Sequence, residues 1–107
     1  MLDVLPADAA AVKAILARLV PDREVWAYGS RVTGKARPAS DLDIVVRGSF
    51  RLDLGTLSRL REAFENAPIG PRVDITDWNA ISPDFQALIQ EAHEPLQTPL
   101  LPPQART

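Results

Sequence analysis

The sequence predicts an α/β protein, in the broad α+β sense, built on a small mixed β-sheet covered by helices. Short runs rich in β-branched and aromatic residues recur at 24–28, 42–46 and 72–76. The stretches 12–19, 57–64 and 85–89 carry apolar residues at the three- and four-residue spacing of amphipathic helices. Because the strands are few and alternate with helices, we expect a small sheet whose helices cover one face.

The first helix is expected to begin near Pro6 and to end at Pro21-Asp22. Its buried stripe is Val12, Ile15, Leu16 and Leu19. The second helix has Asp53 as its expected N-cap, and its stripe is Leu57, Leu60 and Phe64. Both patterns place one apolar face of each helix against the sheet.

A third helix is expected after Ser82, which is a favoured N-cap residue, with Pro83 at the first helical position. Its inward-facing residues are expected to be Phe85, Leu88 and Ile89. From residue 95 onward, prolines at 95, 99, 102 and 103 oppose a helix and favour an extended or frayed tail. The predicted organisation is therefore one domain over residues 1–94 and a Pro-rich tail over 95–107.

Composition restricts the class of protein. With 107 residues the chain is long enough for one domain, and it contains no cysteine for a disulfide or a thiolate metal site. The net charge of −2 and the pI near 5.3 argue against direct nucleic-acid binding, which favours a basic stripe. The acidic N-terminus and the lack of a long apolar run indicate neither a signal peptide nor a membrane span, so we expect a cytoplasmic protein.

Gly29-Ser30 follows the first expected strand and is the first part of a candidate site. Gly29 lacks a Cβ and allows the backbone to approach a ligand closely. Ser30 offers a hydroxyl and a backbone N–H at a strand-to-helix turn, where unpaired N–H groups favour anions. This pair is a candidate phosphate-binding turn.

Three aspartates form the second part of the candidate site. Asp41 and Asp43 lie two residues apart at the start of the second strand, so their side chains share one face, roughly 7 Å apart along the chain. Asp74 takes the same face of the third strand if that strand is a neighbour, and Asp77 is the competing candidate. Carboxylates this close repel one another unless a divalent cation neutralises them, and Mg²⁺ accepts carboxylate and phosphate oxygens together.

The combination of Gly29-Ser30, Asp41-Leu42-Asp43 and Val73-Asp74 resembles the minimal nucleotidyltransferases of the DNA polymerase β-like superfamily. The resemblance implies the polymerase β-like fold and transfer of AMP from ATP with two Mg²⁺ ions. It implies that Asp41, Asp43 and Asp74 are the catalytic residues and the metal ligands, with Asp74 also helping to deprotonate the acceptor hydroxyl. Nucleotide and phosphate contacts are implied for Gly29, Ser30, Arg31 and Lys35. One departure is Thr33, at a position where relatives commonly carry a basic residue.

The resemblance also implies a partner, because such proteins are often encoded beside a HEPN-domain protein. The leading hypothesis is an antitoxin that adenylylates a tyrosine of its HEPN partner. Two alternatives remain open: a catalytic subunit that nucleotidylates a small-molecule alcohol with a separate substrate-binding subunit, and a non-catalytic antitoxin that occludes its partner. Self-association is equally left open.

Trp26 and Trp78 are expected to be core or interface aromatics, and His93 a surface residue or helix-end cation.

Overall fold

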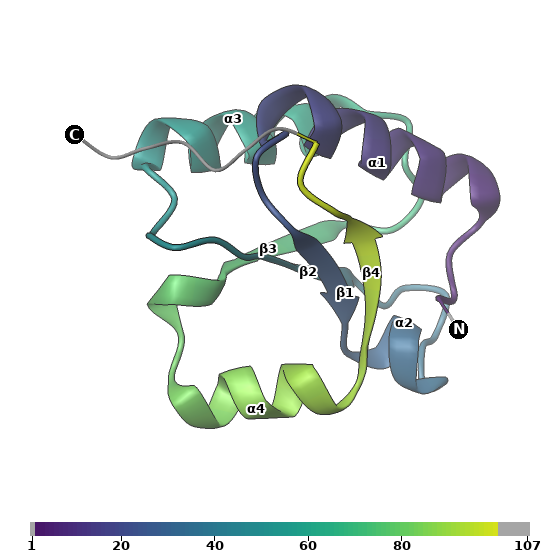
Figure 1. The fold of residues 1–107 in the computed structure, drawn as a ribbon. Helices are drawn as coiled ribbons and strands as arrows, with labels where there is room; N and C mark the ends of the chain where they lie inside the picture. Colours follow the sequence, from purple (N-terminus) through teal and green to yellow (C-terminus); the bar gives the residue numbers. More distant parts are fainter. Residues whose placement is uncertain (1, 101–107) are drawn as a thin grey trace.

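A computed structural model describes residues 2–100 of the chain. Three α-helices of nine or more residues, one single-turn helix, one 3₁₀ turn and four strands follow one another along this range (Figure 1). In chain order they are α1 (Pro6–Leu19), β1 (Val25–Tyr28), α2 (Ser30–Thr33), β2 (Leu42–Val46), α3 (Leu54–Asn66), β3 (Val73–Asp77), η1 (Trp78–Ala80), α4 (Pro83–Glu91) and β4 (His93–Gln97).

The four strands form one mixed sheet in the order β3-β2-β1-β4. β1 pairs antiparallel with both β2 and β4, whereas β2 and β3 run parallel. α3 provides the crossover that a parallel pair requires. The predicted fold class is confirmed.

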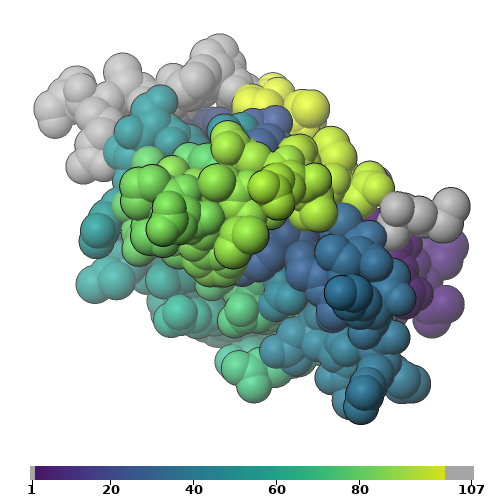
Figure 2. Space-filling model, turned by 90° about the horizontal axis from the view of Figure 1, so that it is seen from below, coloured from purple at the N-terminus to yellow at the C-terminus, as the bar shows by residue number. Residues whose placement is uncertain are grey.

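The helices cover both faces of the sheet, which corrects the expectation of one covered face. α1 and α3 pack together on one face, and α4 lies on the other (Figure 1). Viewed from the α4 side, α4 covers only part of its face, and α2 with the following loop lies beside it (Figure 2). The side chains of a strand alternate between faces, so β1 and β2 supply both layers.

The larger core lies between the sheet and the α1/α3 layer. Its fully buried members come from α1, β1, β2 and α3, and the largest of them are Leu16, Leu42, Ile44 and Leu60. A smaller cluster of Trp26, Val45 and Ile89 lies under α4. The stripes expected on the first two helices are therefore confirmed as the inner face of the α1/α3 layer.

The helix starts read from the sequence are also confirmed. The Asp53 side chain accepts a hydrogen bond from the backbone N–H of Thr56, and the Ser82 hydroxyl accepts one from the N–H of Phe85. Both residues satisfy N–H groups that have no partner within the helix.

α4 is rotated relative to the expectation from its apolar stripe. Ile89 is 2% exposed, but Leu88 is 64% exposed and Phe85 is 37% exposed. An apolar spacing shows that two residues share a side of a helix, but it does not show which part of that side is covered. Within residues 2–100, no helix is both long and apolar enough to span a membrane.

The expected tail boundary at residue 95 is wrong, because β4 continues to Gln97. Leu96 and Gln97 are buried, and the Gln97 side-chain amide donates to the carbonyls of Val20 and Arg23 at 2.9 Å each. β4 is the edge strand next to β1, where a proline is tolerated in a sheet. The rest of the expected tail, 101–107, lies outside the described residues.

Candidate active site

Gly29 ends β1 in a conformation that favours glycine, with φ of +78°. A Cβ placed on Gly29 would lie 2.3 Å from Oδ2 of Asp43. The position therefore excludes a side chain for two reasons, namely backbone strain and the approach of the Asp43 carboxylate. The turn and the carboxylate strand, separated by 14 positions in sequence, are in direct contact.

Asp43 and Asp74 occupy paired positions on parallel neighbouring strands. Leu42, Ile44 and Val46 point into the α1/α3 core, so Asp43 points to the α4 side of the sheet. The same alternation places Val73 and Ile75 against the core and Asp74 on the α4 side. Asp41 lies two residues before Asp43 and immediately before β2. The structure thus brings Asp43 and Asp74 together, as the sequence predicts.

The carboxyl of Asp43 lies in an electrostatically unfavourable position. Burial, followed by the negative charges of Asp74 and Asp41, raises the pKa of Asp43 to about 6. This shift shows that all three carboxylates act on one region of the surface. A bound cation would offset the negative charge around Asp43.

The donor chemistry of this site fits a hard divalent cation such as Mg²⁺, which takes carboxylate oxygens together with phosphate oxygens. Within residues 2–100, no three acidic, histidine or cysteine side chains converge closely enough to hold a metal ion unaided. Asp43 and Asp74, at paired strand positions, would offer two carboxylates to such a cation.

Ser30 and Lys35 are the two polar residues expected at the phosphate-binding turn. Ser30 begins the single-turn helix α2, and its hydroxyl makes no hydrogen bond to any residue in the range 2–100. The backbone N–H of Lys35 donates to the Ser30 carbonyl at 3.1 Å, and the Lys35 side chain is exposed just after Gly34. Thr33 is exposed at the end of α2.

Arg31 differs from the expectation of a phosphate contact. Its side chain is buried at 8% exposure, and the guanidinium donates to backbone carbonyls of Asp3, Arg37, Pro38 and Ser40. The donors of its guanidinium thus have partners within the protein, and the phosphate contact stays a prediction. No local pattern indicates such distant carbonyl partners.

Tyr28 is a site-face residue that the sequence did not single out. It pairs with Asp43 across β1 and β2, and its hydroxyl lies 2.8 Å from Oγ1 of Thr76 on β3. Phe85 of α4 meets the Tyr28 ring edge-to-face at 5.8 Å between centroids. Burial raises the pKa of Tyr28, opposed by the Thr76 hydrogen bond. Strand alternation could have indicated this position, because Tyr28 lies two residues after Trp26 and therefore shares its face of β1.

Asp77, the competing candidate for the third carboxylate, has a structural role. It is the last residue of β3, on the opposite side from Asp74 by strand alternation. Its carboxylate accepts hydrogen bonds from the backbone N–H groups of Leu52 and Asn79 at 2.9 and 3.1 Å. Asp77 therefore connects the end of β3 to the start of α3.

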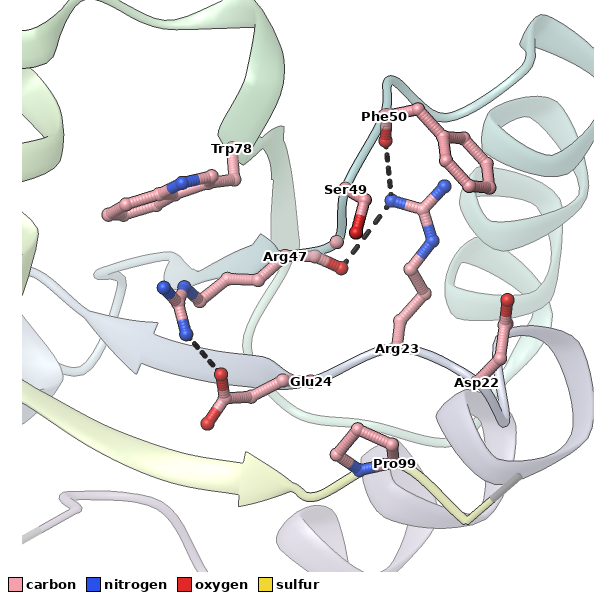
Figure 3. Close-up of a pocket in the computed structure, with 9 residues that line it drawn as sticks. Asp22, Arg23, Glu24, Arg47, Ser49, Phe50, Trp78 and Pro99 are labelled. Carbon is pink, nitrogen blue, oxygen red and sulfur yellow. Dashed lines mark hydrogen bonds and ion pairs between the residues drawn. The ribbon is translucent and has the colours of Figure 1, made fainter. Parts of the chain in front are cut away.

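A cavity of about 240 Å³ lies at the other end of β1, away from the three aspartates (Figure 3). Arg47 forms an ion pair with Glu24 there and lies over the ring of Trp26, with its guanidinium carbon 3.9 Å from the ring centroid. The His93 ring stacks on Trp26 with centroids 3.8 Å apart, and its Nδ1 lies 3.1 Å from the carbonyl of Gln90 in the last turn of α4.

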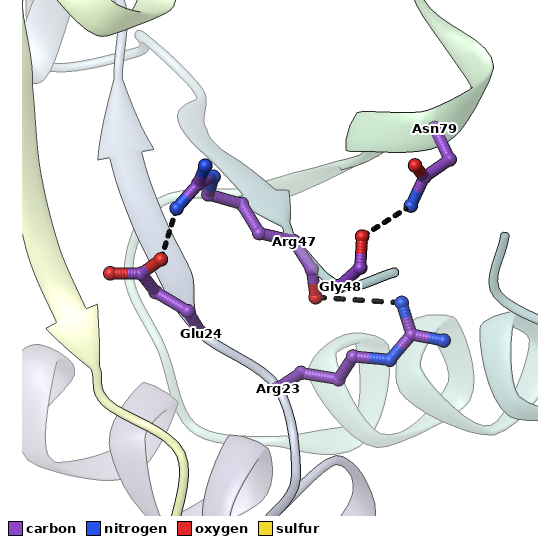
Figure 4. A network of polar contacts seen from close by, with 5 residues as sticks. All are labelled: Arg23, Glu24, Arg47, Gly48 and Asn79. Carbon is purple, nitrogen blue, oxygen red and sulfur yellow. Dashed lines mark hydrogen bonds and ion pairs between the residues drawn. The ribbon is translucent and has the colours of Figure 1, made fainter. Parts of the chain in front are cut away.

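Backbone carbonyls beside this cavity are held by two further side chains (Figure 4). Arg23 donates to the carbonyls of Phe50 and Arg47, and Asn79 donates to that of Gly48 at 2.9 Å. These contacts fix the loop between β2 and α3. Trp26 is a core aromatic as expected, and Trp78 meets it edge-to-face at 5.7 Å.

Comparison with known proteins identifies the family. A family model described as polymerase beta, nucleotidyltransferase, matches residues 11–97. The Haemophilus influenzae protein named "probable protein adenylyltransferase MntA" is 44% identical over 96 residues, which cover 90% of this chain and 84% of that protein.

Solved structures of toxin–antitoxin complexes share the fold. One, determined with AMP-PNP, has a TM-score of 0.70 at 21% identity and covers 83% of this chain and 72% of the matched chain. Another contains a tri-AMPylated Shewanella oneidensis HEPN toxin with an MNT antitoxin; its TM-score is 0.63 at 17% identity, over 85% of this chain and 70% of that chain. The extent of the family match and the close relative together show that this chain belongs to the polymerase β-type nucleotidyltransferase family.

Proposed function

We propose that this chain transfers AMP from ATP to a hydroxyl group of a HEPN-domain protein, most specifically a tyrosine, and thereby acts as an antitoxin. The observation that carries the proposal is the placement of Asp43 and Asp74 at paired positions, with the Gly29 turn against Asp43. A phosphate turn beside paired carboxylates is the arrangement that phosphoryl chemistry with divalent metal requires.

The relatives support the nucleotide and the acceptor. The H. influenzae relative is named as an adenylyltransferase, and one structural neighbour was determined with AMP-PNP. In another neighbour the HEPN toxin itself carries AMP groups. These are properties of those proteins. Because they agree with the carboxylate site of this chain, we propose the same nucleotide and the same acceptor for it.

Each residue of the site has a distinct task in the proposed reaction. Asp41, Asp43 and Asp74 would hold Mg²⁺, which when bound neutralises the triphosphate and lowers the pKa of the attacking hydroxyl. The Ser30 hydroxyl and the exposed Lys35 would contact the β- and γ-phosphates. Gly29 keeps the turn close to Asp43, so that the phosphates and the carboxylates share one surface.

The chemical step is a nucleotidyl transfer with pyrophosphate as leaving group. The acceptor oxygen forms a bond to the α-phosphorus of ATP while the bond from that phosphorus to the bridging oxygen breaks. Asp74, exposed on β3, would take the proton of the acceptor hydroxyl. Positioning and charge neutralisation account for most of the rate in such transfers.

The test is the intact mass of the HEPN-domain protein encoded beside this chain, after incubation with the chain, ATP and Mg²⁺. We expect mass increments of AMP with the natural sequence and none with Asp41→Asn/Asp43→Asn. The matched control is Glu62→Gln/Glu65→Gln, which removes two exposed acids from α3 and should leave the increments unchanged.

Other outcomes assign the function differently. Inhibition of the partner without any mass change, and equal inhibition by the Asp41→Asn/Asp43→Asn variant, would contradict transfer and support occlusion. Pyrophosphate release that depends on a free small alcohol, with the partner unmodified, would support a small-molecule acceptor.

A further inference from the structure

The guanidinium of Arg31 is enclosed by backbone carbonyls. Nε and Nη2 both donate to the carbonyl of Ser40, at 3.0 and 2.8 Å. Nη2 also lies 3.3 Å from the carbonyl of Pro38, and Nη1 donates to that of Asp3 at 2.9 Å. All three nitrogens therefore have partners, and the side chain is 8% exposed.

These contacts join two parts of the site that are separated in sequence. Arg31 directly follows Ser30 in α2, and Ser40 directly precedes Asp41. The paired donation to one carbonyl fixes both the position and the orientation of that peptide group. The Arg31 side chain thus links the turn at Ser30 to the residue that precedes Asp41.

The segment that Arg31 holds is itself a closed turn. The N–H of Ser40 donates to the carbonyl of Arg37 at 2.9 Å, and the N–H of Arg37 donates to the Ser40 hydroxyl at 2.8 Å. The turn is exposed on its outer side and contacts Arg31 through its carbonyls. Without the guanidinium, carbonyls that face inward would lose their donor.

The N-terminal segment is attached to the same residue. The N–H of Asp3 donates to the Arg31 carbonyl at 2.7 Å, and the Arg31 side chain returns a hydrogen bond to the Asp3 carbonyl. Arg31 therefore connects three segments: the start of the chain, α2 and the loop before β2.

We infer that Arg31 is a positioning residue, which sets the spacing between Ser30 and Asp41 rather than contacting the nucleotide. The structural part of this inference is independent of the reaction, and its catalytic consequence rests on the proposed function. Lysine cannot replace arginine here, because one ammonium lacks the planar fork that donates to one carbonyl while reaching two others.

The first test is amide hydrogen exchange of the full chain without nucleotide. Arg31→Lys keeps the charge and removes the fork, and we expect the Arg37 and Ser40 amides to exchange at least tenfold faster. Arg18→Lys, an exposed arginine of α1, is the control and should change neither amide. Unchanged exchange in Arg31→Lys would overturn the inference, even if the chain proves to transfer AMP.

The kinetic test separates positioning from phosphate contact. If Arg31 positions Asp41, Arg31→Lys should lower kcat for AMP transfer at least tenfold and change the KM for ATP by less than threefold. A phosphate contact predicts a raised KM with kcat retained, and that result would overturn the inference. If the unmodified chain shows no transfer, only the proposed function fails, since the exchange result stands by itself.

A measurement on the natural sequence covers the case in which Arg31→Lys does not fold. The Arg31 Nε–H resonance should be protected from solvent exchange without nucleotide and should stay protected when Mg²⁺ and AMP-PNP are added. Protection that arises only after nucleotide addition would show a phosphate contact and would overturn the inference.

Discussion

Asp43 on β2 and Asp74 on β3 stand opposite each other in a parallel pair of strands, with both side chains on the face that α4 only partly covers. Parallel pairing at this register places two negative charges on one small area of the sheet. Two like charges placed this close repel each other and do not stabilise the fold. A cationic ligand shared by the two carboxylates, as in the proposed function, would offset this repulsion.

The first prediction concerns Asp43 and pH. Its folded-state pKa of about 6 exceeds the ordinary value of 3.8, so the folded state binds more protons between these values. Ionised Asp43 therefore destabilises the metal-free fold above pH 6, and the penalty disappears as the pH falls towards 4. Because the side chain is partly exposed, Asp43→Asn should stabilise the fold by only about 1 kcal/mol at pH 7.5.

Urea unfolding in EDTA at pH 7.5 and pH 4.5 measures this difference. The stability gain of Asp43→Asn should be present at pH 7.5 and absent at pH 4.5. An equal gain at both pH values would show that charge is not its cause.

The second prediction uses two glycines with similar backbone angles. Gly29 and Gly34 have φ of +78° and +82°, but a Cβ on Gly34 would meet no atom within 4 Å. Gly34→Ala should cost about 1–2 kcal/mol from backbone strain alone. Gly29→Ala should cost more stability and, by displacing Asp43, reduce AMP transfer on the order of 100-fold.

Thermal unfolding and transfer rates of the two variants provide the comparison. Equal loss of activity in both would mean that the approach of Gly29 to Asp43 does not matter.

The third prediction concerns the hydrogen bond between Tyr28 and Thr76, which spans β2 on the site face. Tyr28→Phe and Thr76→Val each remove one partner and keep the side-chain shape. A double-mutant cycle of unfolding free energies should give a coupling of about 0.5–1.5 kcal/mol. Additive effects would show that the contact contributes nothing.

The fourth prediction follows from β4. A chain that ends at residue 100 keeps buried Leu96 and the two hydrogen bonds of the Gln97 side chain, whereas one that ends at residue 94 loses both. The shorter chain also leaves Val25 and Trp26 of β1 without their β4 partners. We expect the 1–100 chain to unfold cooperatively and the 1–94 chain to lack a cooperative transition by circular dichroism. A cooperative transition in both would show that the domain ends before β4.

The sequence predicted those parts of the fold that depend on local chemistry. The alternation in 42–46 and the caps at Asp53 and Ser82 are each determined by a few neighbouring residues. β4 was missed because Pro95 argues against a strand, and only its place at the sheet edge makes the proline acceptable.

The candidate site likewise contains residues whose positions were predictable from the sequence and residues whose contacts were not. Asp43 and Asp74 were predictable because strand alternation fixes their face once the two strands are neighbours. The partners of Arg31 were not predictable, because every residue has a backbone carbonyl and residue type does not indicate which one accepts a hydrogen bond. One of these carbonyls belongs to Asp3, 28 positions away. The exposure of Leu88 depends on how α4 is rotated against the sheet, which its own spacing does not determine.

Calorimetric titration of the chain with AMP-PNP, in Mg²⁺ and in EDTA, tests most directly whether the aspartate face is a metal-nucleotide site. We predict binding that requires Mg²⁺, that is lost in Asp41→Asn/Asp43→Asn and that is retained in Glu62→Gln/Glu65→Gln. Binding of equal strength in EDTA, or unchanged binding by the Asp41→Asn/Asp43→Asn variant, would contradict the assignment of these carboxylates to metal and nucleotide.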